Sequence, residues 1–559
     1  MKTRSMLNVA FVFVCVIALT LTACGAAATP APVQVQKSAA TQAAPPVKLA
    51  EPTQAPAPTS APAAAPSQAT AAPAATPRPV SVEGKPVSQI VVTPPRDLPP
   101  ESWPRDMFFK EYGVNPLMDT NEEHLSTFAM DVDTASYTMM RKFITDGKLP
   151  PAESVRVEEY VNYFNYDYPS PETGAFAIHL EGAPSAFGQG YYLLRVGLQG
   201  KRIDASQRKD AVLTFLIDVS GSMRDGGRLE MVKKALEMLV NELRPTDQVG
   251  IVVFTTSARD VLQPTYVSNK SAILSAIKLL QPESSTNVEQ GLSRAYSMAS
   301  RAYRKGAINH IILCSDGVAN VAGTNANTIL AQAKEYATRD ITLSTVGVGM
   351  GNYNDVILEQ LADKGNGNYA YVDTLEQAHR VFVENLTGML QVIAKDAKVQ
   401  VDFNPAVVSR FRLIGYENRA VENQDFRNDT VDAGEVGAGH NVTALYEVKF
   451  RDEVAASQQG NALVVYVRYQ DVETGKVREI NQTFGRTQFG DSFDKTSPSF
   501  RLAAAVAEYA EILRNSYWAQ GSTLGNVLNL AQRVKQSLSD DKDVIEFVDL
   551  VSRASRLRR

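Results

Sequence analysis

Strands and helices alternate from Asp210 to Gln391, and this alternation limits how the chain can fold more than any other feature. Apolar runs such as AVLTFLI, QVGIVVF and AINHIILC have the length of buried strands. Between them lie segments with helical periodicity, from RLEMVKKALEMLVNEL early in the unit to EQAHRVFVENLTGMLQVI at its end. The alternation predicts a doubly wound, mostly parallel α/β sheet covered on both faces. We expect the strand order 3-2-1-4-5-6, with RDVLQPT as an antiparallel edge strand.

The flanks of this unit have a different pattern. Runs of β character lie before it, in AFAIHLEGAP and YYLLRVGLQG, and after it, in KVQVDF, RFRLIG, VTALYEVKF and the hairpin ALVVYVRYQDVETGKVREINQTF. We expect one β-sandwich, made from 173–209 and 393–490, with the α/β domain of 210–392 inserted between its strands. The segment 100–172 is expected to be an N-terminal extension, and 491–559 a helical region.

The first residues predict the cellular compartment. Lys2 and Arg4 precede a short apolar stretch that ends in LTAC, the pattern of a signal peptide over 1–23. LTAC followed by glycine resembles a lipobox, which implies cleavage before Cys24 and a lipid on its sulfur. The run 24–99 is rich in Ala, Pro, Gln and Thr, has little to bury, and is expected to be a disordered tether. We therefore expect an extracytoplasmic lipoprotein of the cell envelope, held at a membrane by its lipid anchor.

Composition and local motifs argue against several partners. The 559 residues carry a formal net charge of −5 and no basic patch interleaved with aromatic side chains, so nucleic-acid binding is not expected. GVGMG at 347–351 lacks the GK[ST] of a phosphate-binding loop, so we interpret it as a turn and expect no nucleotide. The five histidines are scattered without an HExxH pair, so zinc chemistry is not expected.

Five oxygen-bearing side chains mark the expected site. Asp218, Ser220 and Ser222, in DVSGSM, follow the first strand of the α/β unit. Asp316, in SDG, follows the fourth strand, and Thr286 lies in the loop that opens the third helix. Because ligands of an open α/β sheet bind outside the carboxyl strand ends where the strand order reverses, the two aspartates should meet there. Carboxylates and hydroxyls without imidazole or thiolate suit Mg²⁺, Mn²⁺ or Ca²⁺ better than zinc.

This set of residues resembles the metal-ion-dependent adhesion site of von Willebrand factor type A (VWA) domains. The resemblance implies that the serines and the threonine contact a divalent cation directly or through water, with the aspartates direct or behind them. It also implies that an acidic side chain of a protein partner completes the coordination. Stretches such as DVDTASY and EEYVNYF upstream, and VDAGEVGAGH downstream, are similar to a bacterial family of VWA lipoproteins with N- and C-terminal extensions. That similarity runs from about residue 100 to the end.

Three features invite other interpretations. DVDT at 131–134 begins like a phosphatase nucleophile motif, but its fifth position is Ala135, and a helix capped by Asp133 or Thr134 is favoured. Ser220 would need a neighbouring general base to act as a nucleophile, and its motif supplies none. The tyrosines of EEYVNYFNYDYP could stack on sugars, but packing inside the protein is favoured. We expect no enzyme activity.

The favoured hypothesis is an envelope-anchored lipoprotein whose VWA domain binds a protein ligand through a divalent cation. Two alternatives stay open. The chain could be a structural or assembly component of the envelope in which the metal only stabilises the fold, or it could be a hydrolase.

Overall fold

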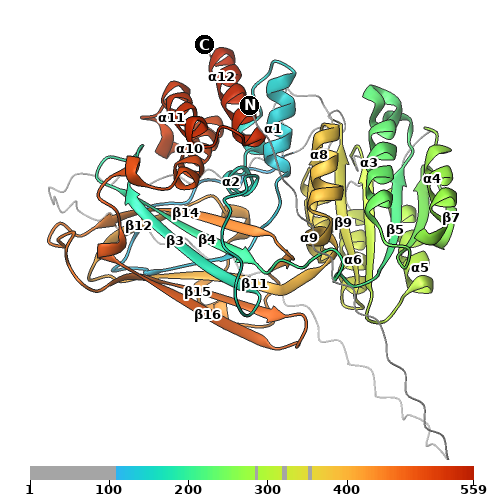
Figure 1. Ribbon diagram of the computed structural model, residues 1–559, viewed down its shortest axis with the longest axis horizontal. Helices are drawn as coiled ribbons and strands as arrows, with labels where there is room; N and C mark the ends of the chain where they lie inside the picture. The colour runs from blue at the N-terminus through green and yellow to red at the C-terminus, as the bar shows by residue number, and fades with distance from the viewer. Residues whose placement is uncertain (1–108, 284–286, 318–323, 350–354, 559) are drawn as a thin grey trace, which may run out of the picture. The chain divides into compact units, whose positions relative to one another are not determined.

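The computed structural model describes residues 109–283, 287–317, 324–349 and 355–558. Figure 1 shows that this part of the chain contains an α/β unit, two antiparallel sheets and a group of helices that includes the C-terminal ones. Among the described residues, no helix has both the length and the apolar character needed to cross a bilayer.

The α/β unit is built on one six-stranded sheet with the order β10-β9-β8-β5-β6-β7. Its strands are β5 (Ala211–Asp218), β6 (Gln248–Phe254), β7 (Ala258–Tyr266), β8 (Ile308–Ser315), β9 (Ile341–Val348) and β10 (Tyr369–Val372). All neighbours run parallel except β7, which pairs antiparallel with β6 at the edge. Numbered within the unit, this is the expected order 3-2-1-4-5-6, and it reverses between β5 and β8.

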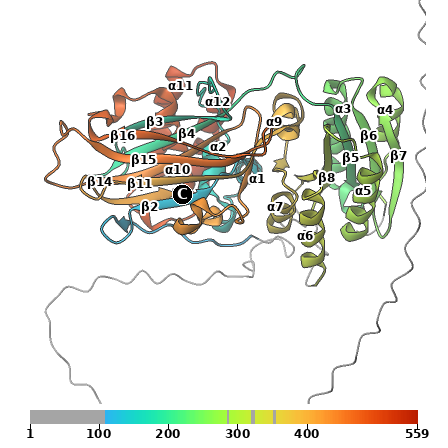
Figure 2. The same cartoon turned by 90° about the horizontal axis from the view of Figure 1, so that it is seen from below.

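Helices cover both faces of this sheet because side chains alternate between the faces along each buried strand. In β5, Phe215 packs into the core under one set of helices and Leu216 into the core under the other. The first set is α3 (Arg228–Glu242), α4 (Lys270–Lys278) and the segment from α8 (Leu375–His379) to α9 (Leu386–Leu390). The second set is α5 (Val288–Ala302), α6 (Thr324–Ala337) and α7 (Asp355–Lys364). Figures 1 and 2 show the two layers.

The last helix of the unit differs from its expected form. A π-helical segment, Arg380–Glu384, separates α8 from α9, so the run is not one continuous α-helix. Val392 and Ile393, expected at the helix end, begin the strand β11 (Val392–Phe403) instead. Pairing explains the difference, because Val392 lies opposite Gly437 and the next residues lie opposite β15. The partner strands therefore outweigh the local helical pattern.

Two antiparallel sheets enclose the flanking core. One has the order β1-β12-β14-β4-β3, and the other β13-β11-β15-β16, with β2 paired to β11. The strands are β1 (Met118–Asp119), β2 (Leu125–Ala129), β3 (Phe176–Pro184), β4 (Tyr192–Gly200), β12 (Val408–Ile414), β13 (Gly434–Gly437), β14 (Asn441–Phe450), β15 (Asn461–Asp471) and β16 (Val477–Gly485). Strands before and after the α/β unit pair directly, as in β4 with β14. The α/β unit is thus inserted into a sandwich made from both flanks, as predicted.

The short strands β1 and β2 come from the segment expected to lie outside the sandwich. Met118 and Asp119 pair with β12, and β2 pairs with the middle of β11 along its whole length. Phe128 of β2 is fully buried in the sandwich core. The sandwich therefore takes strands from three parts of the chain rather than two.

The C-terminal helices α10 (Pro498–Leu513), α11 (Leu524–Ser537) and α12 (Lys542–Leu557) form a further core together with α1 (Ala135–Thr145) and α2 (Val157–Asn162). Tyr160, Tyr163, Tyr166 and Tyr168 are all buried in this core. The ring of Tyr163 stacks on Tyr137 with centroids 4.0 Å apart. The tyrosine-rich segment thus packs inside the protein, and its rings are not presented as a sugar-stacking surface.

Candidate metal centre

The two predicted aspartates lie at neighbouring strand ends. Asp218 is the last residue of β5, and Asp316 directly follows β8. The two strands are parallel neighbours, with Ile217 opposite Cys314, so their carboxyl ends share one edge of the sheet. Both carboxylates are buried, at 0% and 2% residue exposure. The structure therefore brings together the two carboxylates that the topology argument placed at the reversal of strand order.

Hydrogen bonds hold the Asp218 carboxylate in a fixed orientation. Its Oδ1 accepts from the Ser220 backbone N–H at 2.8 Å, and its Oδ2 accepts from the Ser315 hydroxyl at 2.8 Å. Burial raises the pKa of Asp218 to about 6, with Asp316 acting in the same direction and the two serines against it. Ser315 belongs to the same short motif as Asp316, but no pattern around it pointed to a role at this site.

The predicted hydroxyls lie between the carboxylates. Ser220 Oγ and Ser222 Oγ are 3.0 Å apart, and the Ser222 hydroxyl donates to Asp316 Oδ1 at 3.1 Å. The short 3₁₀ turn Gly221–Gly227, which begins directly after Ser220, carries Ser222 back toward Asp316. Hard oxygen ligands at right angles around Mg²⁺, each about 2.0–2.1 Å away, would lie about 2.8–3.0 Å from one another. The donor set and its spacing therefore fit a small divalent cation.

Thr286 lies outside the described residues, and so does Cys24. Two contacts fix the chain on either side of Thr286. The Glu283 N–H donates to the carbonyl of Val219, within DVSGSM, at 2.6 Å. Asn287 caps α5 by accepting from the Gln290 N–H at 3.1 Å.

Sequence reasoning missed an arginine at this site. Arg228, the first residue of α3, donates from one terminal nitrogen to Asp316 Oδ2 at 2.5 Å and to the Ser222 carbonyl at 3.2 Å. Its side chain is 14% exposed. Gly349, which directly follows β9, has φ +74°, and a Cβ there would collide with Nε and Cδ of Arg228. That glycine therefore leaves room for the side chain of Arg228 at a backbone conformation that favours glycine.

Comparisons with known proteins agree with the fold of the α/β unit. The profile of the von Willebrand factor type A domain matches residues 213–385, that of von Willebrand factor matches 104–195, and that of "Uncharacterized protein YfbK, C-terminal" matches 388–557. The chain is 36% identical over 445 residues to the uncharacterized protein YfbK of Escherichia coli K12, across 76% of this chain and 77% of that protein. The chain belongs to the YfbK family of VWA proteins.

More distant matches concern smaller parts of the chain. The human inter-alpha-trypsin inhibitor heavy chain H2 is 27% identical over 191 residues, which cover 32% of this chain and 20% of that protein. The solved structure of a von Willebrand factor type A protein from Catenulispora acidiphila is 17% identical and covers 67% of this chain and 89% of its own, with a TM-score of 0.41.

The DVDT motif has a structural use in this YfbK-family chain. The helix α1 begins after Thr134, as expected, but no side chain caps it. Asp133 instead accepts from the Tyr369 N–H at 2.9 Å, and Asp131 accepts from the Asp133 N–H at 2.9 Å. Both carboxylates then face Arg419, at 3.1 and 3.3 Å. The motif therefore begins a network of ion pairs rather than capping a helix.

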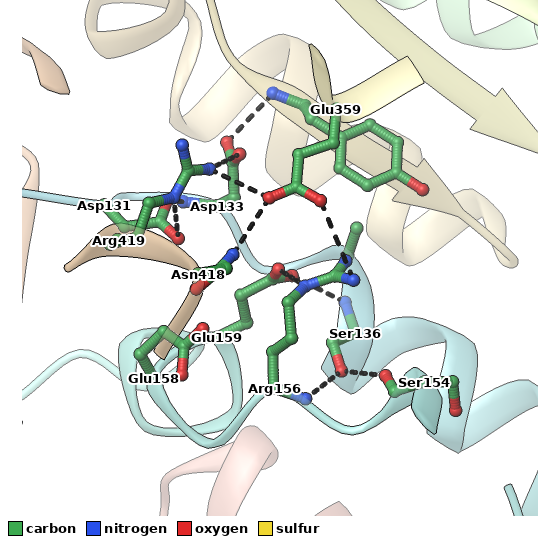
Figure 3. A network of polar contacts seen from close by, with 12 residues as sticks. Asp131, Asp133, Ser136, Ser154, Arg156, Glu158, Glu159, Glu359, Asn418 and Arg419 are labelled. Carbon is green, nitrogen blue, oxygen red and sulfur yellow. Dashed lines mark hydrogen bonds and ion pairs between the residues drawn. The ribbon is translucent and has the colours of Figure 1, made fainter. Parts of the chain in front are cut away.

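Figure 3 shows this network, which joins the VWA domain to the segments around it. Arg419 also pairs with Glu359 at 3.1 Å and with Asp363 at 2.7 Å, both in α7 of the VWA domain. Arg156 pairs with Glu159 and lies 3.8 Å from Glu359. Burial, together with the neighbouring Asp131, raises the pKa of Asp133 well above its usual range. Two arginines thus pair with a group of mostly buried carboxylates, and these ion pairs connect the VWA domain to the segments beside it.

A second acidic cluster lies apart from the predicted ligands. Asp396, Asp432 and Glu435 bring carboxylate oxygens within 4.8 Å of one another. Lys364 pairs with Asp432 at 3.1 Å, and Lys334 lies 3.8 Å from it. Burial and the two neighbouring acids raise the pKa of Glu435 well above its usual range. Both lysines face this cluster and offset part of its charge, so we assign it no metal.

The remaining reactive side chains have core environments. Cys314 is buried in β8, and burial raises the pKa of its thiol to about 12. Burial lowers the pKa values of His310 and His440 to about 4. His310 lies 2.5 Å from the hydroxyl of Thr342, so at least one of its ring nitrogens is used within the sheet.

Proposed function

We propose that this chain is a cell-envelope lipoprotein whose VWA domain captures an acidic side chain of a protein partner through a divalent cation. The cation, which we propose to be Mg²⁺ with Mn²⁺ or Ca²⁺ as alternatives, would be held by Asp218, Ser220, Ser222, Thr286 and Asp316. The observation that carries the proposal is the meeting of four of these side chains at adjacent strand ends, with oxygen spacings of 3.0 and 3.1 Å. When bound, the cation would supply an electrophilic centre for a carboxylate from outside the chain.

The chain's own residues explain how such a centre would be kept ready. Asp218 is held from both sides by Ser220 and Ser315, so its oxygens need no rearrangement to accept a cation. Ser222 is half-buried, whereas Asp218 is fully buried, and we infer that the group is reached from the side of Ser222. We call the proposed site of Asp218, Ser220, Ser222, Thr286 and Asp316 the cation seat. An open seat of this kind leaves coordination positions on the cation for a partner, whereas a structural site closed by protein ligands would leave none.

Metal binding is tested by calorimetry with Mg²⁺ and Mn²⁺ on the wild type and on Asp218→Ala. Asp225→Ala is a matched control, because Asp225 is an exposed carboxylate on the same loop. We expect Asp218→Ala to abolish binding and Asp225→Ala to leave it within about twofold, since exposed charges contribute little. Equal binding by the wild type and Asp218→Ala would refute the assignment of the cation seat.

Capture of a partner is tested in envelope extracts with and without EDTA, comparing the wild type with Ser222→Ala. Capture that disappears with EDTA and with Ser222→Ala supports a metal-bridged interaction. Capture of the same protein in both conditions would favour the alternative, a structural component with a stabilising metal. Anchoring is tested separately, since Cys24→Ala should release the protein from membranes if a lipid on that cysteine holds it there.

A further inference from the structure

Arg228 lies where its charge must affect any cation at the proposed seat. Its guanidinium is 2.5 Å from Asp316 Oδ2, while the other oxygen of that carboxylate faces the Ser222 hydroxyl at 3.1 Å. The arginine thus holds the far side of Asp316 and leaves the near side turned toward the hydroxyls. With Asp316 at 2% and Arg228 at 14% side-chain exposure, water screens this pair only weakly.

The charges of the seat can be counted from these residues. Asp218 and Asp316 together carry two negative charges, and Arg228 contributes one positive charge. The seat without a cation therefore has a formal charge of −1. With a divalent cation the seat becomes +1. Without the arginine, the same seat would be −2 when empty and neutral when loaded.

This count has opposite consequences for the two ligands of the seat. A less negative seat attracts a cation less strongly, whereas a loaded seat that keeps a positive charge attracts an external carboxylate more strongly. We propose that Arg228 is a positioning residue that lowers the affinity of the seat for the metal and raises its affinity for the acidic partner. This inference rests on the proposed function, because it concerns the same seat.

The glycine at position 349 supports a dedicated place for this side chain. Its positive φ and the lack of a side chain allow the backbone to approach Arg228 closely, and a Cβ would overlap the arginine side chain at three atoms. A methyl group there should therefore push the guanidinium away from Asp316 without changing any charge. Gly349→Ala offers a second way to perturb the pair, independent of removing the arginine.

The test compares the full chain with Arg228→Gln, Arg228→Lys and Gly349→Ala. Calorimetry measures the affinity for Mn²⁺ alone. Titration of acetate into the Mn²⁺-saturated protein, followed by water-proton relaxation, measures the affinity for a carboxylate. Arg224→Gln is the matched control, because Arg224 is exposed on the same loop and its loss changes the net charge equally.

Arg228→Gln should bind Mn²⁺ about tenfold more tightly and acetate about tenfold more weakly. Gly349→Ala should shift both affinities in the same directions, Arg228→Lys should stay close to the wild type, and Arg224→Gln should change neither. Loss of Mn²⁺ binding in Arg228→Gln, or equal affinities in Arg228→Gln and the wild type, would overturn the inference. If Asp218→Ala still abolishes Mn²⁺ binding in that case, the proposed function stands alone. Failure of the wild type and of every variant to bind Mn²⁺ would overturn both.

Discussion

Replacing Arg419 with methionine should loosen the attachment of the VWA domain to the strands around it. The guanidinium pairs with Asp131, Asp133 and Glu359 at 3.1, 3.3 and 3.1 Å, and with Asp363 at 2.7 Å. The side chains of Asp131 and Glu359 are 2% and 6% exposed, so water cannot replace the lost partner without opening the structure. Methionine keeps the apolar stem of arginine and removes its charge, which isolates the contribution of the ion pairs.

The size of the effect follows from which carboxylates lose their partner. Breaking a buried pair by removing one member costs about 3–5 kcal/mol, because the other charge stays buried. Asp363 is 35% exposed, so its pair adds less than about 1 kcal/mol. Asp133, with its strongly raised pKa, can take up a proton rather than remain as a bare charge. We therefore expect about 3 kcal/mol at pH 7, equivalent to about a 150-fold increase in the local opening equilibrium.

Hydrogen exchange measured by mass spectrometry reports this opening where it occurs. Amides of α7 should exchange about 150-fold faster in Arg419→Met, whereas amides of α4, on the opposite face of the sheet, should not change. Arg427→Met is the matched control, because Arg427 pairs with Glu479 at 2.7 Å but is 59% exposed. The difference between Arg419→Met and the wild type should shrink from pH 7 to pH 5, since protonation relieves the abandoned carboxylates. Equal exchange in the two methionine variants, or a difference that grows at low pH, would refute the reasoning.

Two further substitutions test buried positions elsewhere. Burial, followed by the charge of Glu417, raises the pKa of Glu158 to about 7 from an ordinary 4.5. The native state therefore holds a proton that the unfolded state has released, and stability should fall by up to about 3 kcal/mol as the pH rises from 4.5 to 7. Thermal unfolding at these two pH values should show a smaller difference for Glu158→Gln than for the wild type or the exposed control Glu172→Gln, and an equal difference would contradict this pKa. Gly434→Ala should lower the free energy of unfolding by about 1–3 kcal/mol, because its Cβ would overlap the carbonyl of Met130. Gly521→Ala is the control, because a Cβ at that position meets nothing within 4 Å and should not change the stability. Similar Tm values for the two variants would argue against the close contact at Gly434.

The parts of the fold that the sequence predicted are those controlled by local pattern. The buried strands of the α/β unit are continuous apolar runs, and a mostly parallel sheet follows from the helices between them. Once the strand order is known, Asp218 and Asp316 must approach each other, because they follow adjacent parallel strands. Their meeting could therefore be inferred from two short motifs, although Ser222 of one and Asp316 of the other are 94 positions apart.

The parts that could not be predicted depend on contacts between distant segments. The pairing of Arg419 with Asp131 joins residues 288 positions apart, and neither has a local pattern that points to the other. The two residues of β1 are too few to show any periodicity, and only pairing with β12 makes them a strand. Arg228 reads as an ordinary polar residue at the start of a helix. The place of its side chain depends on Gly349, far along the chain, where the lack of a Cβ leaves space for it.

The contacts of the VWA domain also limit how it can move. At the neck of the insertion, the Lys209 N–H donates to the side chain of Gln391 at 2.9 Å, so entry and exit are tied together. Asp373, which directly follows β10, accepts hydrogen bonds from Nη2 and Nε of Arg141 in α1, at 2.6 and 2.8 Å, and α7 is held through Arg419. A domain held at these three places cannot rotate about its point of insertion without breaking buried ion pairs. If the proposed anchoring at a membrane is correct, the reach toward a partner must therefore come from the segment 24–99, whose composition predicts a flexible tether, and not from the insertion itself.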